Sequence, residues 1–256
     1  GAWVYRLAIA WLTWELTNST LWLGLIAFAH MLPVLTLCPL AGATADRYGH
    51  KVQLMLSVAL TTAEVLVLAI LVMSGLMTVE ILFVLAFING TGRAFAMPSR
   101  QAFVVQLVEP RNMSAAIGVG SATHHGANFV GPALGGLLID QYGMWAAFLY
   151  CVLSGVLAVI AIACIRNQPH PVRAAAGPGL FSDVVEGFRY TLRHEGIRLV
   201  ILMVGVLALF IKPYMEMLAA VADRVLGMGA EGLSLLASAS GLGAMCGVEA
   251  VLPAAV

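Results

Sequence analysis

Long apolar runs occupy most of this sequence and limit the structures it can form. A helix that crosses a bilayer core of about 30 Å needs about 20 residues. Hydrophobic residues make up 61% of the chain and charged residues only 10%, whereas soluble domains are about 45–50% apolar and about 25% charged. The scan predicts spans over residues 2–17, 21–44, 51–74, 78–99, 112–139, 145–166, 197–221 and 231–252.

These runs predict an all-α polytopic membrane protein. Lipid offers the backbone no hydrogen-bond partners, so a spanning segment must be a helix or part of a closed barrel. The runs are too long and too continuously apolar for barrel strands. The four cysteines, Cys38, Cys151, Cys164 and Cys246, lie in or beside apolar runs without metal-site spacing, so we interpret them as core- or lipid-facing residues.

Basic residues gather in alternate connections between the predicted spans. Those after the second, fourth and sixth spans carry Arg47, Lys51, Arg100, Arg111, Arg166, Arg173, Arg189, Arg193 and Arg198. The opposite connections carry Arg224 alone. Because Lys and Arg mark cytoplasmic loops, we predict that the first set faces the cytoplasm. The formal net charge of zero argues against a nucleic-acid-binding surface.

One connection, residues 167–196, is much longer than the others. It begins with a Pro, Gly and Ala-rich stretch typical of linkers. It continues with an apolar residue at every fourth position, which predicts an amphipathic helix lying along the cytoplasmic interface. We therefore divide the chain into an N-terminal bundle (1–166), a cytoplasmic linker (167–196) and the start of a second bundle (197–256).

The charged turn over residues 42–51 reads GATADRYGHK. It resembles the motif G-x-L-A-D-R-x-G-R-K, which lies between the second and third helices of major facilitator superfamily transporters. The matching residues are Gly42, Asp46, Arg47, Gly49 and Lys51. Thr44 and His50 replace the usual Leu and Arg.

The fifth predicted span resembles a second motif, G-x8-G-x3-G-P-x2-G-G, of proton-coupled exporters in that superfamily. Gly118, Gly131, Pro132, Gly135 and Gly136 fit it, and Ala127 replaces the middle glycine. The stretches AWLTWELTNST and PSRQAFVVQLV also look like the exporter branch that contains macrolide-efflux and enterobactin-exporter-like proteins. The resemblance covers essentially the whole chain and implies a fold of twelve helices. We expect the N-terminal six-helix half and the first two helices of the second half, without the beginning of helix one or helices nine to twelve.

Each motif has two interpretations. The charged turn can act as a latch, in which Asp46 accepts bonds at a helix terminus and docks the two bundles in one state of an alternating-access cycle. The resemblance implies that this is the outward-facing state. Alternatively, it only fixes membrane topology. In the fifth span, Gly131, Pro132 and Gly135 predict a bent, closely packed helix that acts as a hinge or seal. The alternative is ordinary packing of small residues.

Polar residues inside the predicted spans are costly and therefore candidates for substrate or proton coupling. The resemblance implies that helices one, four and seven line the cavity, which selects Arg6, Asn89, Arg93, Lys212 and Glu216. Lys212 and Glu216 can instead neutralise each other across one turn. Glu64, His124 and His125 are of types that can carry a proton. The resemblance implies that helices three and five line the cavity less often, so we favour a structural role for each of them. We interpret His30 as a satisfied packing residue.

These observations predict a proton-coupled exporter of drug-like or siderophore-like molecules, working by alternating access in a bacterial-type inner membrane. A lysophospholipid flippase of the same superfamily, with a less charged cavity, is the rival within transport. A non-transporting membrane protein is the alternative in another class. The polar residues form no catalytic grouping, so we expect no enzyme activity. We also expect no cofactor, metal or nucleic acid, and a monomer whose partners are its substrate, protons and lipid.

Overall fold

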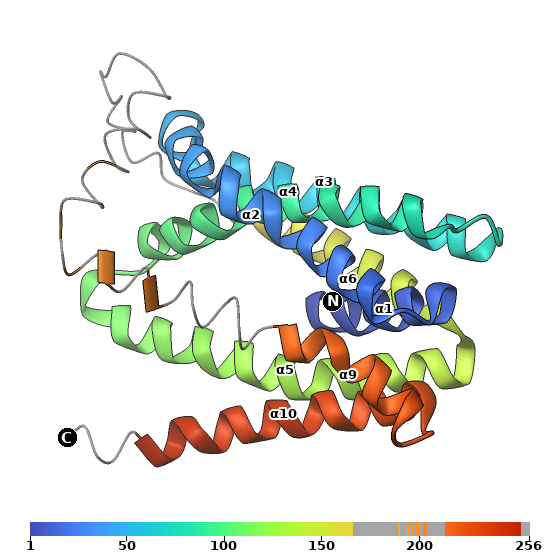
Figure 1. The fold of residues 1–256 in the computed structure, drawn as a ribbon. Helices are drawn as coiled ribbons and strands as arrows, with labels where there is room; N and C mark the ends of the chain where they lie inside the picture. Colours follow the sequence, from blue (N-terminus) through green and yellow to red (C-terminus); the bar gives the residue numbers. More distant parts are fainter. Residues whose placement is uncertain are drawn as a thin grey trace.

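The computed structural model describes residues 1–165 and 213–251, together with 189, 194, 196, 198, 199, 202 and 203. Helices are the regular structure of this part of the chain, and each overlaps one predicted span, so the expected all-α fold is confirmed. Figure 1 shows them running back and forth along one direction. They are α1 (Ala2–Thr17), α2 (Thr20–Tyr48), α3 (His50–Met73), α4 (Val79–Leu107), α5 (Met113–Tyr142), α6 (Met144–Cys164), α9 (Pro213–Arg224) and α10 (Gly229–Val251).

Two helices extend further than the apolar runs indicated. Helix α2 ends at Tyr48 instead of residue 44, and α4 ends at Leu107 instead of residue 99. Arg100, which was expected in a connection, therefore lies within α4. A helix satisfies its own backbone hydrogen bonds whatever its side chains, so it can continue beyond the bilayer where an apolar scan stops. Among the described helices, α2, α3, α4 and α6 are long and apolar enough to cross a membrane.

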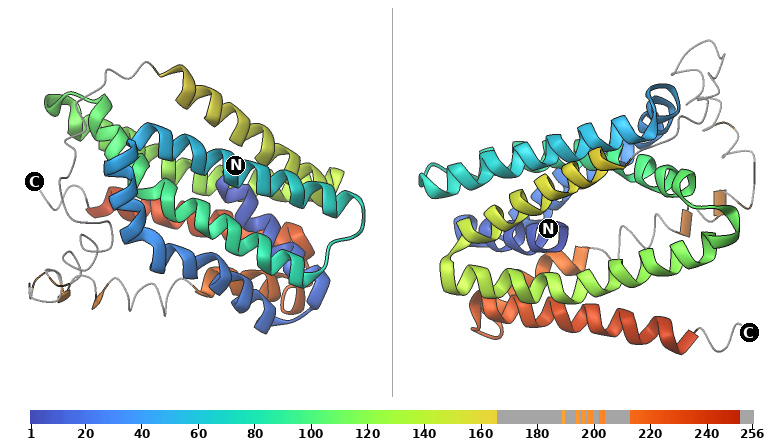
Figure 2. Two further views of the ribbon diagram at one scale, coloured as in Figure 1. Left: turned by 90° about the horizontal axis from the view of Figure 1, so that it is seen from above. Right: turned by 180° about the vertical axis from the view of Figure 1, so that it is seen from behind.

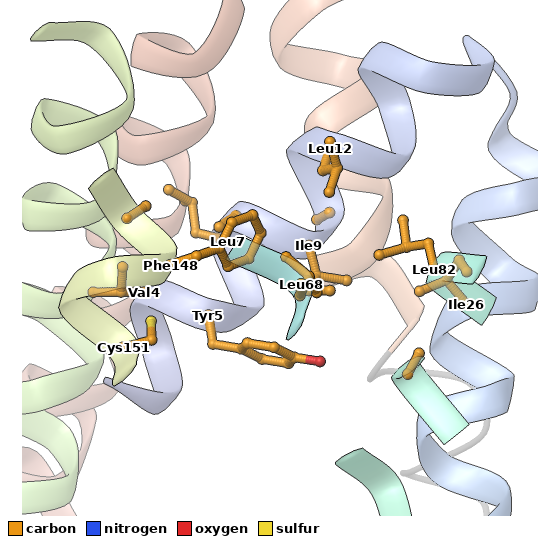
Figure 3. Close-up of a cluster of buried hydrophobic side chains, with 14 of the residues drawn as sticks. Val4, Tyr5, Leu7, Ile9, Leu12, Ile26, Leu68, Leu82, Phe148 and Cys151 are labelled. Carbon is orange, nitrogen blue, oxygen red and sulfur yellow. The ribbon is translucent and has the colours of Figure 1, made fainter. Parts of the chain in front are cut away.

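Helix α1 lies at the centre of the molecule and is buried on nearly every side. It packs against α5, α6, α2 and α4, and Figure 3 shows Leu7 beside Phe148 and Ile9 beside Leu68. The hydrophobic effect does not drive helices together in lipid, so close packing contributes much of the free energy of their association. A continuous apolar contact around α1 therefore fixes the positions of its polar residues.

The remaining helices form two groups around α1. In the first group α4 packs against α2 and α3, and α6 packs against α3, whereas in the second α10 lies along α5 in Figures 1 and 2. The expected close contact of α5 is present. A Cβ at Gly131 would lie 2.5 Å from Trp3 Cβ, and one at Gly135 would lie 3.1 Å from a Leu7 methyl group. The close approach of the α5 backbone to α1 therefore requires glycine at 131, whereas an alanine at 135 would need Leu7 to shift by a few tenths of an ångström.

The two ends of the bundle differ in charge. We call the end with the α2–α3 and α4–α5 connections the basic end, and the other the opposite end. Helix α6 also ends at the basic end, where Lys51 contacts Ala163 and Ile165. The amphipathic helix predicted in the linker falls almost entirely outside the described residues.

Candidate functional site

A polar cluster lies inside the bundle, formed by Tyr5, His30, Glu64 and Asn89 from four different helices. Asn89 Nδ2 donates a 2.6 Å hydrogen bond to Glu64 Oε2. Tyr5 Oη donates to Glu64 Oε1 at 3.4 Å. Tyr5, Glu64 and Asn89 are each only 4% exposed. Glu64, for which the sequence offered no obvious partner, is thus held by donors from α1 and α4.

The four residues of the polar cluster lie at a common depth. His30 is ten residues after the start of α2, and Asn89 is ten after the start of α4. Glu64 is nine residues before the end of α3, and Tyr5 is twelve before the end of α1. At about 1.5 Å per residue, each lies about 14–18 Å from the opposite end, near the middle of a bilayer core of about 30 Å.

His30 is not the fully satisfied packing residue that the sequence suggested. Its ring packs edge-on to Tyr5 with centroids 6.1 Å apart. Its Nε2 atom is buried and has no hydrogen-bond partner in the described part of the chain. Helix α4 passes directly over its backbone, because a Cβ at Gly90 would collide with the His30 carbonyl oxygen. The contact between α2 and α4 is therefore close enough to orient both His30 and Asn89.

Two arginines lie beside the polar cluster. Arg93 is one helical turn beyond Asn89 on α4, and Arg6 follows Tyr5 on α1. Arg93 is exposed, and no ion pair is present for it among the described residues. Arg6, Asn89 and Arg93, three of the five cavity candidates, therefore lie on α1 and α4 next to residues of the polar cluster or within it, and their role in substrate or proton coupling stays a prediction.

Helix α5 brings its two histidines toward the same region. His124 packs edge-on to Trp3 with ring centroids 5.4 Å apart. A cavity of about 40 Å³ runs beside α1 toward α9 and α10, lined by Trp3, Arg6, Leu7, Ala10, Asn128, Pro132, Leu218, Leu233 and Ala237. Lys212 lies outside the described residues, as does the side chain of Glu216.

The charged turn ties three helices of one bundle together at the basic end. Asp46 Oδ1 lies 3.5 Å from His50 Nε2, while its side chain is 69% exposed. Lys51 Nζ donates to the carbonyl oxygens of Ala163 at 3.1 Å and Ile165 at 2.6 Å. Lys51 therefore caps the end of α6 instead of pairing with Asp46, since the last carbonyls of a helix have no partners within it.

The two glycines of the charged turn have different roles. Gly49 ends α2 with a positive φ of 94°, which glycine adopts without strain, so the expected tight turn is present. Gly42 lies inside α2, and a Cβ there would meet nothing within 4 Å in the described structure. Close packing among the described residues therefore does not require Gly42.

A second set of contacts, which the sequence did not reveal, joins α1 to α9 at the opposite end. Trp14 Nε1 donates a 2.9 Å hydrogen bond to Asp223 Oδ2. Arg224 Nη2 donates to the Asn18 carbonyl oxygen at 2.6 Å, and its guanidinium lies 4.7 Å from the centre of the Trp14 ring. We call these four residues the end clamp. Asn18 has a left-handed backbone with φ of 50°, a conformation that asparagine tolerates at a helix end.

Comparison with known proteins gives this arrangement a family. A family model described as "Transmembrane secretion effector" matches residues 1–253. The Staphyloferrin A transporter of Staphylococcus aureus is 24% identical over 161 residues, covering 62% of this chain and 41% of the relative. Multidrug resistance protein 1 of Bacillus subtilis is 26% identical over 153 residues, with 60% and 38% covered. The Multidrug efflux pump Tap of Mycobacterium bovis is 26% identical over 207 residues, with 77% and 49% covered.

The chain spans less than half the length of these three relatives. The family model nevertheless extends over almost all of it, across every described helix. The helical fold, the four apolar spans and the matched model agree with one another. The chain belongs to the transmembrane secretion effector family of the major facilitator superfamily and forms a multi-pass membrane protein.

Proposed function

We propose that the complete protein is a proton-coupled exporter of small molecules. The observation that carries this proposal is Glu64, a carboxyl group buried at mid-membrane depth between donors from α1 and α4. Acidic residues at such depth are rare and are used in proton relays. The family adds support, because similar proteins carry names of transporters and efflux pumps. The protein would act without enzyme chemistry, as a monomer in a bacterial inner membrane, with its basic end in the cytoplasm.

Protonation of Glu64 would change the contacts between helices. As a carboxylate, Glu64 only accepts hydrogen bonds, so it can hold Tyr5 and Asn89 at once and join α3 to both α1 and α4. Charge-assisted bonds of this kind are about twice as strong as neutral ones. Adding a proton removes the charge and makes one oxygen a donor. Both bonds weaken, which frees α1 and α4 to move relative to α3.

The ends of the bundle support an alternating-access cycle. In the proposed division, α9 and α10 begin the second bundle, and residues 167–196 form the linker. The end clamp then joins the bundles on the outer side, through Trp14 with Asp223 and Asn18 with Arg224. On the cytoplasmic side Asp46 is mostly exposed, and its partner in the described structure is His50 of the same turn. This pattern suits a state closed to the outside, and we propose that the charged turn docks on the second bundle in the reverse state.

Growth and efflux assays on cells that express the complete protein test this function. A compound panel is screened with and without an uncoupler, for wild type, Glu64→Gln and the control Glu109→Gln. Glu109 is an exposed acid paired with Arg111 at the basic end, so its loss should not affect coupling. We expect resistance that the uncoupler and Glu64→Gln both abolish, at equal protein abundance. Gradient-independent movement of lysophospholipid, or full efflux by Glu64→Gln, would contradict the proposal.

A further inference from the structure

The cavity beside α1 contains a polar side chain, Asn128, that lacks a hydrogen-bond partner among the described residues. The described lining of the cavity is mostly apolar, and its polar members are Arg6 on α1 and Asn128 on α5. Arg6 already interacts with another group. The half-buried carboxamide of Asn128 forms no hydrogen bond with any residue that the structure describes. Because a polar group among apolar side chains is normally hydrogen-bonded, Asn128 is a candidate for contact with a ligand.

Asn128 lies near the middle of its helix. It is 15 residues after the start of α5 at Met113 and 14 residues before its end at Tyr142. At about 1.5 Å per residue, these counts place it about 21–22 Å from each end of a helix that is longer than the bilayer core of about 30 Å. Polar residues at such depth are costly, and in transporters they mark substrate pathways.

Two contacts hold the α5 backbone in place beside Asn128. The carbonyl oxygen of the next residue, Phe129, accepts a 3.3 Å hydrogen bond from Ser238 Oγ of α10, and Ser238 is buried. Three residues beyond Asn128, Gly131 brings α5 against α1, where a Cβ would lie 2.5 Å from Trp3 Cβ. The position of Asn128 in the wall of the cavity is therefore set by packing against α1 on one side and α10 on the other.

The size and chemistry of the cavity favour a small uncharged polar group. The cavity volume is about 40 Å³, and one water molecule needs at least about 10–15 Å³, so there is room for a group of about three heavy atoms. A carboxamide carries no charge and both donates and accepts hydrogen bonds. It therefore matches an amide or a hydroxyl group, which also donate and accept. A charged group would lose its hydration among the apolar side chains, and Asn128 offers it no counter-charge.

We propose that this cavity binds the amide or hydroxyl group of uncharged amphiphilic substrates, and that the Asn128 carboxamide is its hydrogen-bond partner. The inference rests on the proposed transport function, because it names the class of substrate that is exported. The apolar lining, which includes Trp3 and Leu7 of α1, contacts the carbon atoms next to that group. Asn128 then determines substrate specificity, and Glu64 carries the proton.

A binding assay on the complete protein in nanodiscs tests the inference without transport. Four probes share a pyrene ring and differ in one substituent. Pyreneacetamide is neutral and forms hydrogen bonds, propylpyrene is neutral and forms none, and pyreneacetate and pyrenemethylamine are charged. Binding is followed by energy transfer from tryptophan to pyrene, because Trp3 lines the cavity, and protein-free nanodiscs give the background.

Four variants are compared with wild type. Asn128→Leu and Asn128→Ala both remove the carboxamide, and they differ in how much of the cavity they leave open. Ala237→Leu fills the cavity from the side of α10. Gln141→Leu is the matched control, because it removes an exposed carboxamide near the end of the same helix.

We expect both Asn128 variants to lower the ratio of the affinity for pyreneacetamide to that for propylpyrene by about tenfold, as the loss of one hydrogen bond predicts. Gln141→Leu should leave this ratio unchanged, and Ala237→Leu should weaken the binding of both neutral probes. Equal weakening of both neutral probes in the Asn128 variants would assign Asn128 a structural role and overturn the inference. Tighter binding of a charged probe than of pyreneacetamide would overturn it too, as would no binding of any probe, the result expected if the cavity holds only water.

The two proposals fail in different ways. If compounds are exported under a proton gradient and Asn128→Leu exports all of them as well as wild type does, the transport function stands and the Asn128 site falls. If pyreneacetamide binds through Asn128 but no compound moves under a gradient, the site stands and proton-coupled export falls.

Discussion

In the proposed alternating-access cycle, the hydrogen bond of the end clamp helps to hold the outer side closed, and its contribution can be predicted. Trp14 is 1% exposed, and its indole N–H donates to the Asp223 carboxylate at 2.9 Å. A hydrogen bond to a charged group contributes about 1.5–3 kcal/mol, and an exposed cation–π contact such as that of Arg224 about 0.5–1 kcal/mol. Asp223→Ala should therefore destabilise the outward-closed state by about 2 kcal/mol relative to the outward-open state. The ratio of closed to open molecules should then fall about 25-fold.

Distances between spin labels on the outer side measure this ratio. Labels at Leu76→Cys and Val225→Cys are suitable, because these side chains are 67% and 74% exposed in connections at the opposite end. The background would lack the native cysteines. Asp223→Ala should increase the population with the longer distance. Glu231→Ala removes an exposed acid from the same end and should change nothing.

A double-mutant cycle with Trp14→Phe tests the reasoning itself. Because Phe lacks the indole donor, Asp223→Ala should have little further effect in that background. Equal effects of Asp223→Ala in both backgrounds, or an unchanged distance distribution in the single variant, would refute the role of this hydrogen bond.

Three further substitutions address the other elements. Gly131→Ala should lower the free energy of unfolding by about 1–3 kcal/mol, since the new Cβ would overlap Trp3. Gly126→Ala is the control and should be neutral, because its Cβ would meet nothing within 4 Å. Thermal unfolding in detergent compares the two variants, and equal melting temperatures would contradict the close contact. Lys51→Met should raise hydrogen exchange at the end of α6, because two carbonyl oxygens lose their donor; unchanged exchange would rule out this capping role. Asp46→Asn should weaken efflux at normal protein abundance, and full efflux would count against the latch.

The sequence predicted the helices well because the bilayer sets a minimum apolar length. It misplaced the ends of α2 and α4, since a polar extension such as the one containing Arg100 gives no signal in an apolar scan. It also gave Glu64 no partner, because Tyr5 is 59 residues away along the chain. Counting residues from the opposite end of each helix would have found this contact, as the polar cluster lies at one depth.

The contacts of the end clamp were harder to predict from the sequence than the helices were. Trp14 and Arg224 lie near the ends of apolar runs, where Trp anchors at the interface and Arg marks topology in most membrane proteins. Only the packing of α9 beside α1 shows that they contact each other. The partner of Lys51 was hidden for a similar reason, because it consists of backbone carbonyls more than 100 residues away.

A direct measurement of proton flux is the sharpest test of the proposal that Glu64 carries the proton that drives export. The complete protein is reconstituted into liposomes that contain a pH-sensitive dye, and a compound found in the efflux screen is added. We expect proton movement coupled to the compound in wild type and Glu109→Gln, and none in Glu64→Gln. Equal proton flux through Glu64→Gln would contradict it.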